Sequence, residues 1–115
     1  MSELSKILKT HEYVHTVHDY FWLESMHFNQ LLHGIHPGSF KSSFNACELG
    51  CGYGDTLIFL AIFYPEATFT GFDYNPTHID YANEKAKQLG MENIHFETQD
   101  FRELHLQRSS TYDYI

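Results

Sequence analysis

Between Glu48 and Gly54 the sequence places an acidic residue and then three glycines at alternate positions. The apolar run over residues 44–49 predicts a strand, and the run over residues 56–63 predicts a helix directly after it. Because glycine has no Cβ, the backbone N–H groups of such a turn and the N-terminus of the helix can approach a bound ligand closely. The segment therefore predicts an α/β fold with a loop for a nucleotide-like cofactor.

The spacing of the glycines indicates which cofactor. The dinucleotide fingerprint G-x-G-x-x-G, counted from Gly50 and Gly52, requires a third glycine where this chain has Asp55. A phosphate-binding P-loop requires a lysine at its end, and no lysine lies between Lys41 and Lys85. What remains is E-x-G-x-G-x-G, which resembles motif I of the class I S-adenosylmethionine-dependent methyltransferases. The alternative interpretation is a glycine-rich turn after a buried strand.

A second acidic residue follows at the end of the next predicted strand. Residues 67–72 form that strand and Asp73 ends it, where a carboxylate can accept hydrogen bonds from both ribose hydroxyls of a nucleoside. Asn75 suits the N-cap of a helix and Pro76 suits its first position, while Gly90 would end it. The apolar stripe of this helix consists of Ile79, Ala82, Ala86 and Leu89.

A third strand is predicted from Ile94 by its alternating apolar and polar residues, and it ends at Asp100. In the methyltransferase family a carboxylate or amide just past this strand holds the exocyclic amine of adenine. Gln99 and Asp100 match that position, and Asp100 is the better match. We expect Glu48 to orient the loop or to reach the methionine ammonium through water. Tyr74 is expected either to pack on the adenine or ribose or to face the solvent.

The resemblance thus implies S-adenosylmethionine as the cofactor and identifies a set of cofactor-binding residues, with no metal. These residues are Glu48, Gly50, Cys51, Gly52, Gly54, Asp73, Tyr74, Gln99 and Asp100.

The resemblance covers residues 44–115 and looks most like bacterial members of the class. It implies a Rossmann-like three-layer αβα fold, of which this chain supplies strands 3-2-1 and the start of strand 4, preceded by N-terminal helices. Residues 112–115 match the opening of the fourth strand, where the sequence ends, so we expect a truncated cofactor-binding half. We divide the chain into a helical cap over residues 1–40 and a partial cofactor domain over residues 41–115. Catalytic residues, which commonly follow the fourth strand, cannot be assigned.

Composition restricts the partners and the location. A formal net charge of −8, with only seven lysines and arginines, argues against binding of a nucleic-acid backbone and favours a small-molecule or protein acceptor. No apolar stretch reaches the length of a membrane span, and the N-terminus does not read as a signal peptide. We therefore expect a cytoplasmic protein. In that setting Cys47 and Cys51 are expected to be reduced, and we interpret them as structural.

The N-terminal residues predict two helices, over residues 5–17 and 18–35. Such helices either cap the cofactor cleft or pack against the edge of the sheet. The apolar face expected for the second helix consists of Phe21, Ser25, Phe28, Leu32 and Ile35.

One N-terminal motif indicates a different class of enzyme. His11, Glu12 and His15 form a literal H-E-x-x-H, the signature of zinc metallopeptidases, and His18 adds a further imidazole. On a helix the first two histidines would lie one turn apart, with Glu12 placed to activate a metal-bound water. No further ligand is identifiable by spacing, and nine histidines make a chance match easy. Adventitious metal binding is a third possibility, and ordinary partly exposed histidines are the interpretation we prefer.

Three hypotheses follow. The chain is the cofactor-binding portion of a methyltransferase, or a non-catalytic methyltransferase-like module that works by association, or a zinc peptidase. The second hypothesis predicts an apolar edge on the first strand, covered in a homo-oligomer or by a partner chain that completes the sheet.

Overall fold

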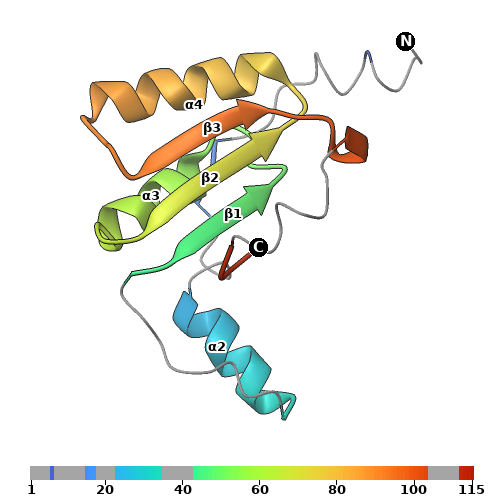
Figure 1. Cartoon of the computed structure of the whole chain (residues 1–115), viewed down its shortest axis with the longest axis vertical. Helices are drawn as coiled ribbons and strands as arrows, with labels where there is room; N and C mark the ends of the chain where they lie inside the picture. The colour runs from blue at the N-terminus through green and yellow to red at the C-terminus, as the bar shows by residue number, and fades with distance from the viewer. Residues whose placement is uncertain (1–5, 7–14, 18–22, 35–42, 104–111) are drawn as a thin grey trace.

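A computed structural model describes residues 6, 15–17, 23–34, 43–103 and 112–115 of the chain. Its centre is a parallel sheet of three strands in the order β1-β2-β3, formed by β1 (Asn45–Leu49), β2 (Thr68–Asp73) and β3 (Ile94–Thr98). Helix α3 (Asp55–Phe63) connects the first two strands, and α4 (Pro76–Gln88) connects the second and third (Figure 1). The predicted α/β fold is confirmed, because parallel strands joined by crossover helices are the βαβ units of a Rossmann-like sheet.

The core lies between the sheet and these two helices. Helix α3 is apolar almost all round and buries most of its residues, whereas α4 is amphipathic and buries one stripe. The residues at the centre of the core are Phe44, Ala46, Leu57, Ile58, Ala61, Phe69, Ile79, Ala82, Ala86 and Phe96. Leu89, which was predicted to continue the α4 stripe, is 50% exposed, because it is the C-cap residue and lies beyond the last turn.

A fourth strand begins beside β1, as the resemblance implies. Tyr114 forms a parallel bridge with Ala46, and the N–H of Cys47 donates to the carbonyl of Tyr114 at 2.9 Å. The Asp113 carboxylate accepts from the N–H of Asn45 at 2.8 Å. Tyr114 therefore lies beside β1 on the side away from β2, where the resemblance places the start of strand 4.

Helix α2 (Leu23–Leu32) contacts this part of the molecule (Figure 1). Nε2 of His27 lies 2.8 Å from the Tyr114 hydroxyl, and Met26 packs against the core. The predicted apolar face of this helix is wrong where it can be examined, since Phe28 is 61% and Leu32 is 65% exposed. The contacts of α2 with the rest of the molecule come instead from Met26 and His27. The members of the predicted face at positions 21 and 35 lie outside the described residues.

The described residues near the N-terminus agree only in part with the predicted helix over residues 5–17. Lys6 is helical, but residues 15–17 have no regular structure and contact the start of α3. A short 3-10 helix, η2 (Phe101–Glu103), follows β3. Within the described ranges, no helix is both long enough and apolar enough to cross a membrane.

Candidate cofactor site

The predicted cofactor residues converge because parallel strands end at one edge of the sheet. Leu49, Asp73 and Thr98 end β1, β2 and β3, and the glycine loop follows the first of these strands. The N–H of Gln99 donates to the carbonyl of Asp73 at 2.9 Å, which joins the segments that follow β2 and β3. The fold thus gathers the predicted residues at the carboxyl edge of the sheet.

The glycine loop turns back on the sheet rather than presenting its amides to a ligand. Gly50 and Cys51 donate from their N–H groups to the carbonyl of Phe72 at 2.7 and 3.0 Å, and Gly54 donates to the carbonyl of Cys51 at 3.0 Å. Gly52 donates to Oδ2 of Asp73 at 2.9 Å. Each of these four N–H groups is therefore satisfied within the fold, and contact of the glycine loop with a ligand stays a prediction.

The glycines nevertheless serve different purposes. All three have left-handed backbones, with φ of 77° at Gly50, 57° at Gly52 and 76° at Gly54. A Cβ at Gly50 would meet nothing within 4 Å, whereas a Cβ at Gly54 would lie 2.5 Å from ring carbons of Phe96. Gly54 therefore lets α3 begin against β3, while Gly50 leaves open space at the turn where a ligand can approach.

Asp73 is held by donors from three directions. Its Oδ1 accepts from the N–H of Asn75 at 2.8 Å and lies 3.3 Å from Nδ1 of His78, while its Oδ2 accepts from Gly52. Sequence reasoning missed His78, which is buried on the first turn of α4. The signal available was its position, three residues after the predicted N-cap and five after the carboxylate.

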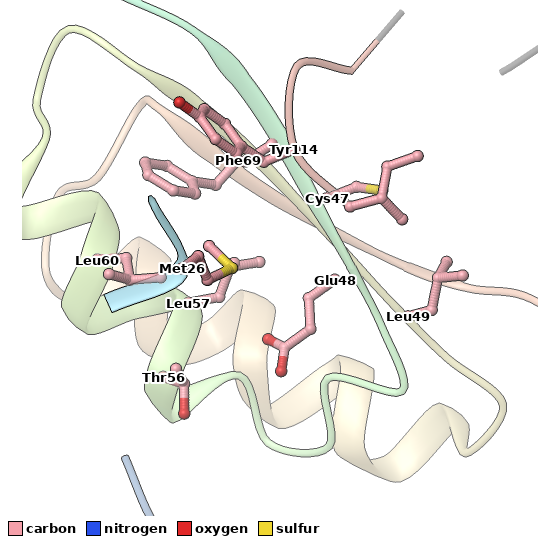
Figure 2. Close-up of a pocket in the computed structure, with 11 residues that line it drawn as sticks. Met26, Cys47, Glu48, Leu49, Thr56, Leu57, Leu60, Phe69 and Tyr114 are labelled. Atoms are coloured by element: carbon pink, nitrogen blue, oxygen red, sulfur yellow. The ribbon is translucent and has the colours of Figure 1, made fainter. Parts of the chain in front are cut away.

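Glu48 points from β1 toward the start of α3, as Figure 2 shows. Burial, together with the negative charge of Asp73, raises the pKa of its carboxyl to about 7. Its Oε2 is a buried side-chain oxygen that finds no hydrogen-bond partner among the described residues. An unpartnered buried acceptor is costly, so this position fits a ligand that brings a donor, such as an ammonium group.

Glu48 lines a mainly apolar cavity of about 300 Å³ beside β1 (Figure 2). The other residues that line it are Met26, Ala46, Cys47, Leu49, Thr56, Leu57, Leu60, Phe69, Tyr114 and Ile115. A carboxylate side chain set in a mainly apolar wall is typical of small-molecule sites.

The predicted adenine-binding residues have partners of their own. The Asp100 carboxylate accepts from the Arg102 backbone N–H at 2.9 Å and from its Nε at 3.0 Å. Gln99 donates from its side chain to the carbonyl of Asp100 at 3.3 Å. The Arg102 side chain is 76% exposed, so the Asp100 carboxylate can exchange this partner for another donor at low cost. Tyr74 and Cys51 are half-buried near the same edge.

Of the histidine motif, the structure describes His15 alone. His15 lies outside any helix, with Nδ1 at 3.0 Å from the Asp55 carboxylate and its ring stacked on Tyr53 at a centroid distance of 4.0 Å. His11, Glu12 and His18 lie outside the described residues. In the part of the chain that the structure describes, no three histidine, cysteine or acidic side chains are grouped to hold a metal.

Comparisons with known proteins agree with this geometry. The family described as "Methyltransferase domain" matches residues 40–115. An uncharacterized protein of Synechocystis sp. is 37% identical over 84 residues, which cover 73% of this chain and 17% of that protein. The tRNA (guanine-N(7)-)-methyltransferase of Rubrobacter xylanophilus is 34% identical over 58 residues, which cover 50% of this chain and 26% of that enzyme.

Solved structures show the same fold. PKMT2 from Rickettsia typhi superposes with a TM-score of 0.74 at 20% identity, covering 84% of this chain and 19% of that chain. The same protein in complex with AdoHcy gives a TM-score of 0.73. The chain therefore spans less than a fifth of the length of the Synechocystis and Rickettsia proteins. Since the family match extends over more than half of the chain, this protein belongs to the methyltransferase domain family, whose class I members use S-adenosylmethionine.

Proposed function

We propose that this chain supplies the S-adenosylmethionine-binding portion of a methyltransferase that acts on a small-molecule or protein acceptor. The observation that carries the proposal is the contact of Gly52 with Asp73, which joins the glycine loop to the carboxylate at the tip of β2. A ribose that meets this carboxylate therefore also lies beside the loop. The family match supports the choice of cofactor.

The bound cofactor would supply a methyl group on a positively charged sulfonium, and the protein would supply mainly position and a dry environment. Asp73 would accept from the ribose, and Gly50 would leave room for the close approach of the ligand. Glu48 fits the methionine ammonium, because its unpartnered oxygen gains a donor and its raised pKa falls beside a positive charge. Asp100 would turn from Arg102 to the adenine amine.

The acceptor class is proposed from charge. A net charge of −8 disfavours close approach of a polyanionic nucleic acid, which leaves small molecules and proteins. The free cysteines Cys47 and Cys51 support a reducing location such as the cytoplasm.

Calorimetric titration with S-adenosylhomocysteine tests the proposal. We expect saturable binding by the wild-type chain and a loss of roughly tenfold or more in Asp73→Asn, because a charged acceptor becomes a partial donor. Asp80→Asn is the matched control, since Asp80 is exposed on α4. Absence of binding by the folded wild-type chain, or equal affinity of both variants, would overturn the proposal.

A second candidate function is association, and the edge of β1 favours it. Tyr114 pairs with this edge at Ala46, while Leu49 is 42% and Ile115 is 63% exposed beside the cavity. An apolar strand edge is a template for another strand, from a second copy or a partner chain that completes the sheet.

Light scattering coupled to size-exclusion chromatography tests association. We expect oligomers whose mass falls in Leu49→Lys, because a charge on the exposed edge opposes strand pairing. Leu89→Lys, at the exposed C-cap leucine after α4, is the control. A monomer at every concentration would exclude self-association and leave only a partner chain.

A further inference from the structure

His78 is a buried histidine near the start of the amphipathic helix α4. It lies on the first turn of α4 with 5% of its surface exposed, and the ring of Tyr53 covers it at a centroid distance of 4.6 Å. A buried imidazole needs hydrogen-bond partners for both nitrogens. Its Nδ1 lies 3.3 Å from Oδ1 of Asp73, and its Nε2 lies 3.5 Å from Nδ2 of Asn75.

Asn75 determines which nitrogen of the ring carries the proton. The Oδ1 of Asn75 caps α4 by accepting from the N–H of Thr77 at 2.9 Å, so its Nδ2 must be the atom that faces His78. An amide nitrogen only donates, and Nε2 of His78 must therefore accept. The proton of a neutral ring then lies on Nδ1, where it can be donated to the Asp73 carboxylate. The helix cap thus fixes the tautomer.

The same contacts fix the carboxylate. Oδ1 of Asp73 is shared by the N–H of Asn75 and Nδ1 of His78, and Oδ2 accepts from Gly52. A carboxylate offers about four lone-pair positions, so three protein donors leave its remaining acceptor capacity on Oδ2. Donors on both oxygens also prevent rotation of the carboxylate plane. Because the Asp73 carboxylate is already held in one orientation, it can accept from a ligand with little further loss of side-chain conformational entropy.

We propose that His78, in the tautomer fixed by Asn75, is a positioning residue that holds Asp73 in the orientation that receives a ribose hydroxyl. The inference rests on the proposed cofactor site and adds to it a residue that acts through Asp73. Its effect should be selective for the ribose, because the imidazole contacts the carboxylate assigned to the ribose.

The tautomer can be measured without any ligand. Long-range ¹H–¹⁵N correlation spectra of the wild-type chain are expected to show a proton on Nδ1 of His78 and none on Nε2. A proton on Nε2 would overturn the inference: alone it leaves Nδ1 without a proton to donate to Asp73, and beside a proton on Nδ1 it contradicts the acceptor role of Nε2. This result is independent of whether the chain binds the cofactor.

Binding then tests the consequence. The probes are S-adenosylhomocysteine and its 2′-deoxy and 3′-deoxy analogues, with affinities measured for wild type, His78→Leu and His78→Asn. Leucine removes the donor, whereas the asparagine amide can place an N–H near the position of Nδ1. In wild type, loss of the hydroxyl that meets Asp73 is expected to weaken binding by about tenfold, typical of a hydrogen bond to a charged group.

In His78→Leu, removal of this hydroxyl should weaken binding by about threefold or less, because a carboxylate that can rotate forms a weaker hydrogen bond with the hydroxyl. His78→Asn should restore the wild-type loss of affinity. An unchanged loss of affinity in a folded His78→Leu would overturn the inference while leaving the cofactor site intact. If His78→Leu and His78→Asn became equally insensitive to the missing hydroxyl, the inference would also be overturned, because the ring would then act through packing. Failure of wild type to bind any probe would instead refute the proposed function together with this inference.

Discussion

The N–H of Gly52 donates to the carboxylate of Asp73 at 2.9 Å, across 21 positions of sequence. One residue belongs to the loop after β1 and the other ends β2, so the contact makes the loop and the carboxylate a single unit. It also gives the Gly52 N–H, which the sequence would assign to a ligand, an acceptor within the fold. The rigidity of the site therefore depends on backbone contacts between neighbouring strands, and substitutions there should affect stability as well as binding.

Gly54 and Gly50 should differ in their tolerance of alanine. Both have left-handed backbones, so each substitution carries a strain of roughly 1 kcal/mol. At Gly54 the new Cβ would also meet Phe96 at 2.5 Å, which should raise the total loss to about 3 kcal/mol. Urea denaturation of Gly54→Ala and Gly50→Ala gives the comparison, and equal losses would contradict the packing role assigned to Gly54.

Glu48→Gln should stabilise the chain at alkaline pH. The pKa of Glu48 is about 7 in the fold, against an ordinary value of 4.5 for a free glutamate, so the folded state binds more protons between these values. The contribution of Glu48 to stability is therefore present below about pH 4.5 and is lost as the pH rises to about 7. Glutamine stays neutral, so the variant should exceed wild type by about 1–3 kcal/mol at pH 8 and show little difference near pH 4.5.

Urea midpoints across this pH range measure the effect, with Glu66→Gln as the control at an exposed position before β2. A difference between Glu48→Gln and wild type that does not change with pH would show that Glu48 ionises normally in the fold.

Asn93→Ala should be among the more destabilising polar substitutions. Its amide nitrogen lies 3.0, 3.3 and 3.2 Å from the carbonyls of Ala61, Tyr64 and Ala67, which join the end of α3 to the turn before β2. Removing the shared donor should cost about 2 kcal/mol, the usual range for acceptors left without a partner.

The control is Gln88→Ala, whose amide makes an exposed contact with Glu84 one turn away and should cost below about 0.5 kcal/mol. Thermal unfolding followed by circular dichroism would resolve the two, and similar midpoints would refute the role given to Asn93.

The two thiols should react slowly in the native chain. Burial raises the pKa of Cys47, and burial together with the charges of Glu48 and Asp73 raises that of Cys51. Since the thiolate is the reactive form, both should react with Ellman's reagent at pH 8 at least about tenfold more slowly than in denaturant. Rapid reaction of either thiol in the native state would contradict this burial.

Much of the fold could be predicted from the sequence because local patterns determine it. The strand that contains Glu48, the N-cap at Asn75 and the helix stop at Gly90 are signalled by neighbouring residues, and each is confirmed. The start of a fourth strand at Tyr114 was expected only through a family resemblance, and an isolated parallel bridge with Ala46 lies at that place. The predicted division at residue 40 remains a prediction.

Predictions that depended on which face of a helix meets the sheet succeeded less well. Phe28 and Leu32 fit an apolar stripe but are exposed, because α2 contacts the rest of the molecule through His27 and Met26. Periodicity defines a stripe only relative to a partner surface, which the sequence of one helix does not contain.

The sequence by itself determined the order of the elements, the glycine loop and the acidic residues that end the strands. Only the tertiary structure decided that the loop amides bond within the fold, that Glu48 keeps an unpartnered oxygen, and that His78 lies behind Asp73. Element order follows from local periodicity and caps, which act over a few residues. Hydrogen-bond partners and raised pKa values depend on burial, which is set by atoms brought together from distant parts of the chain.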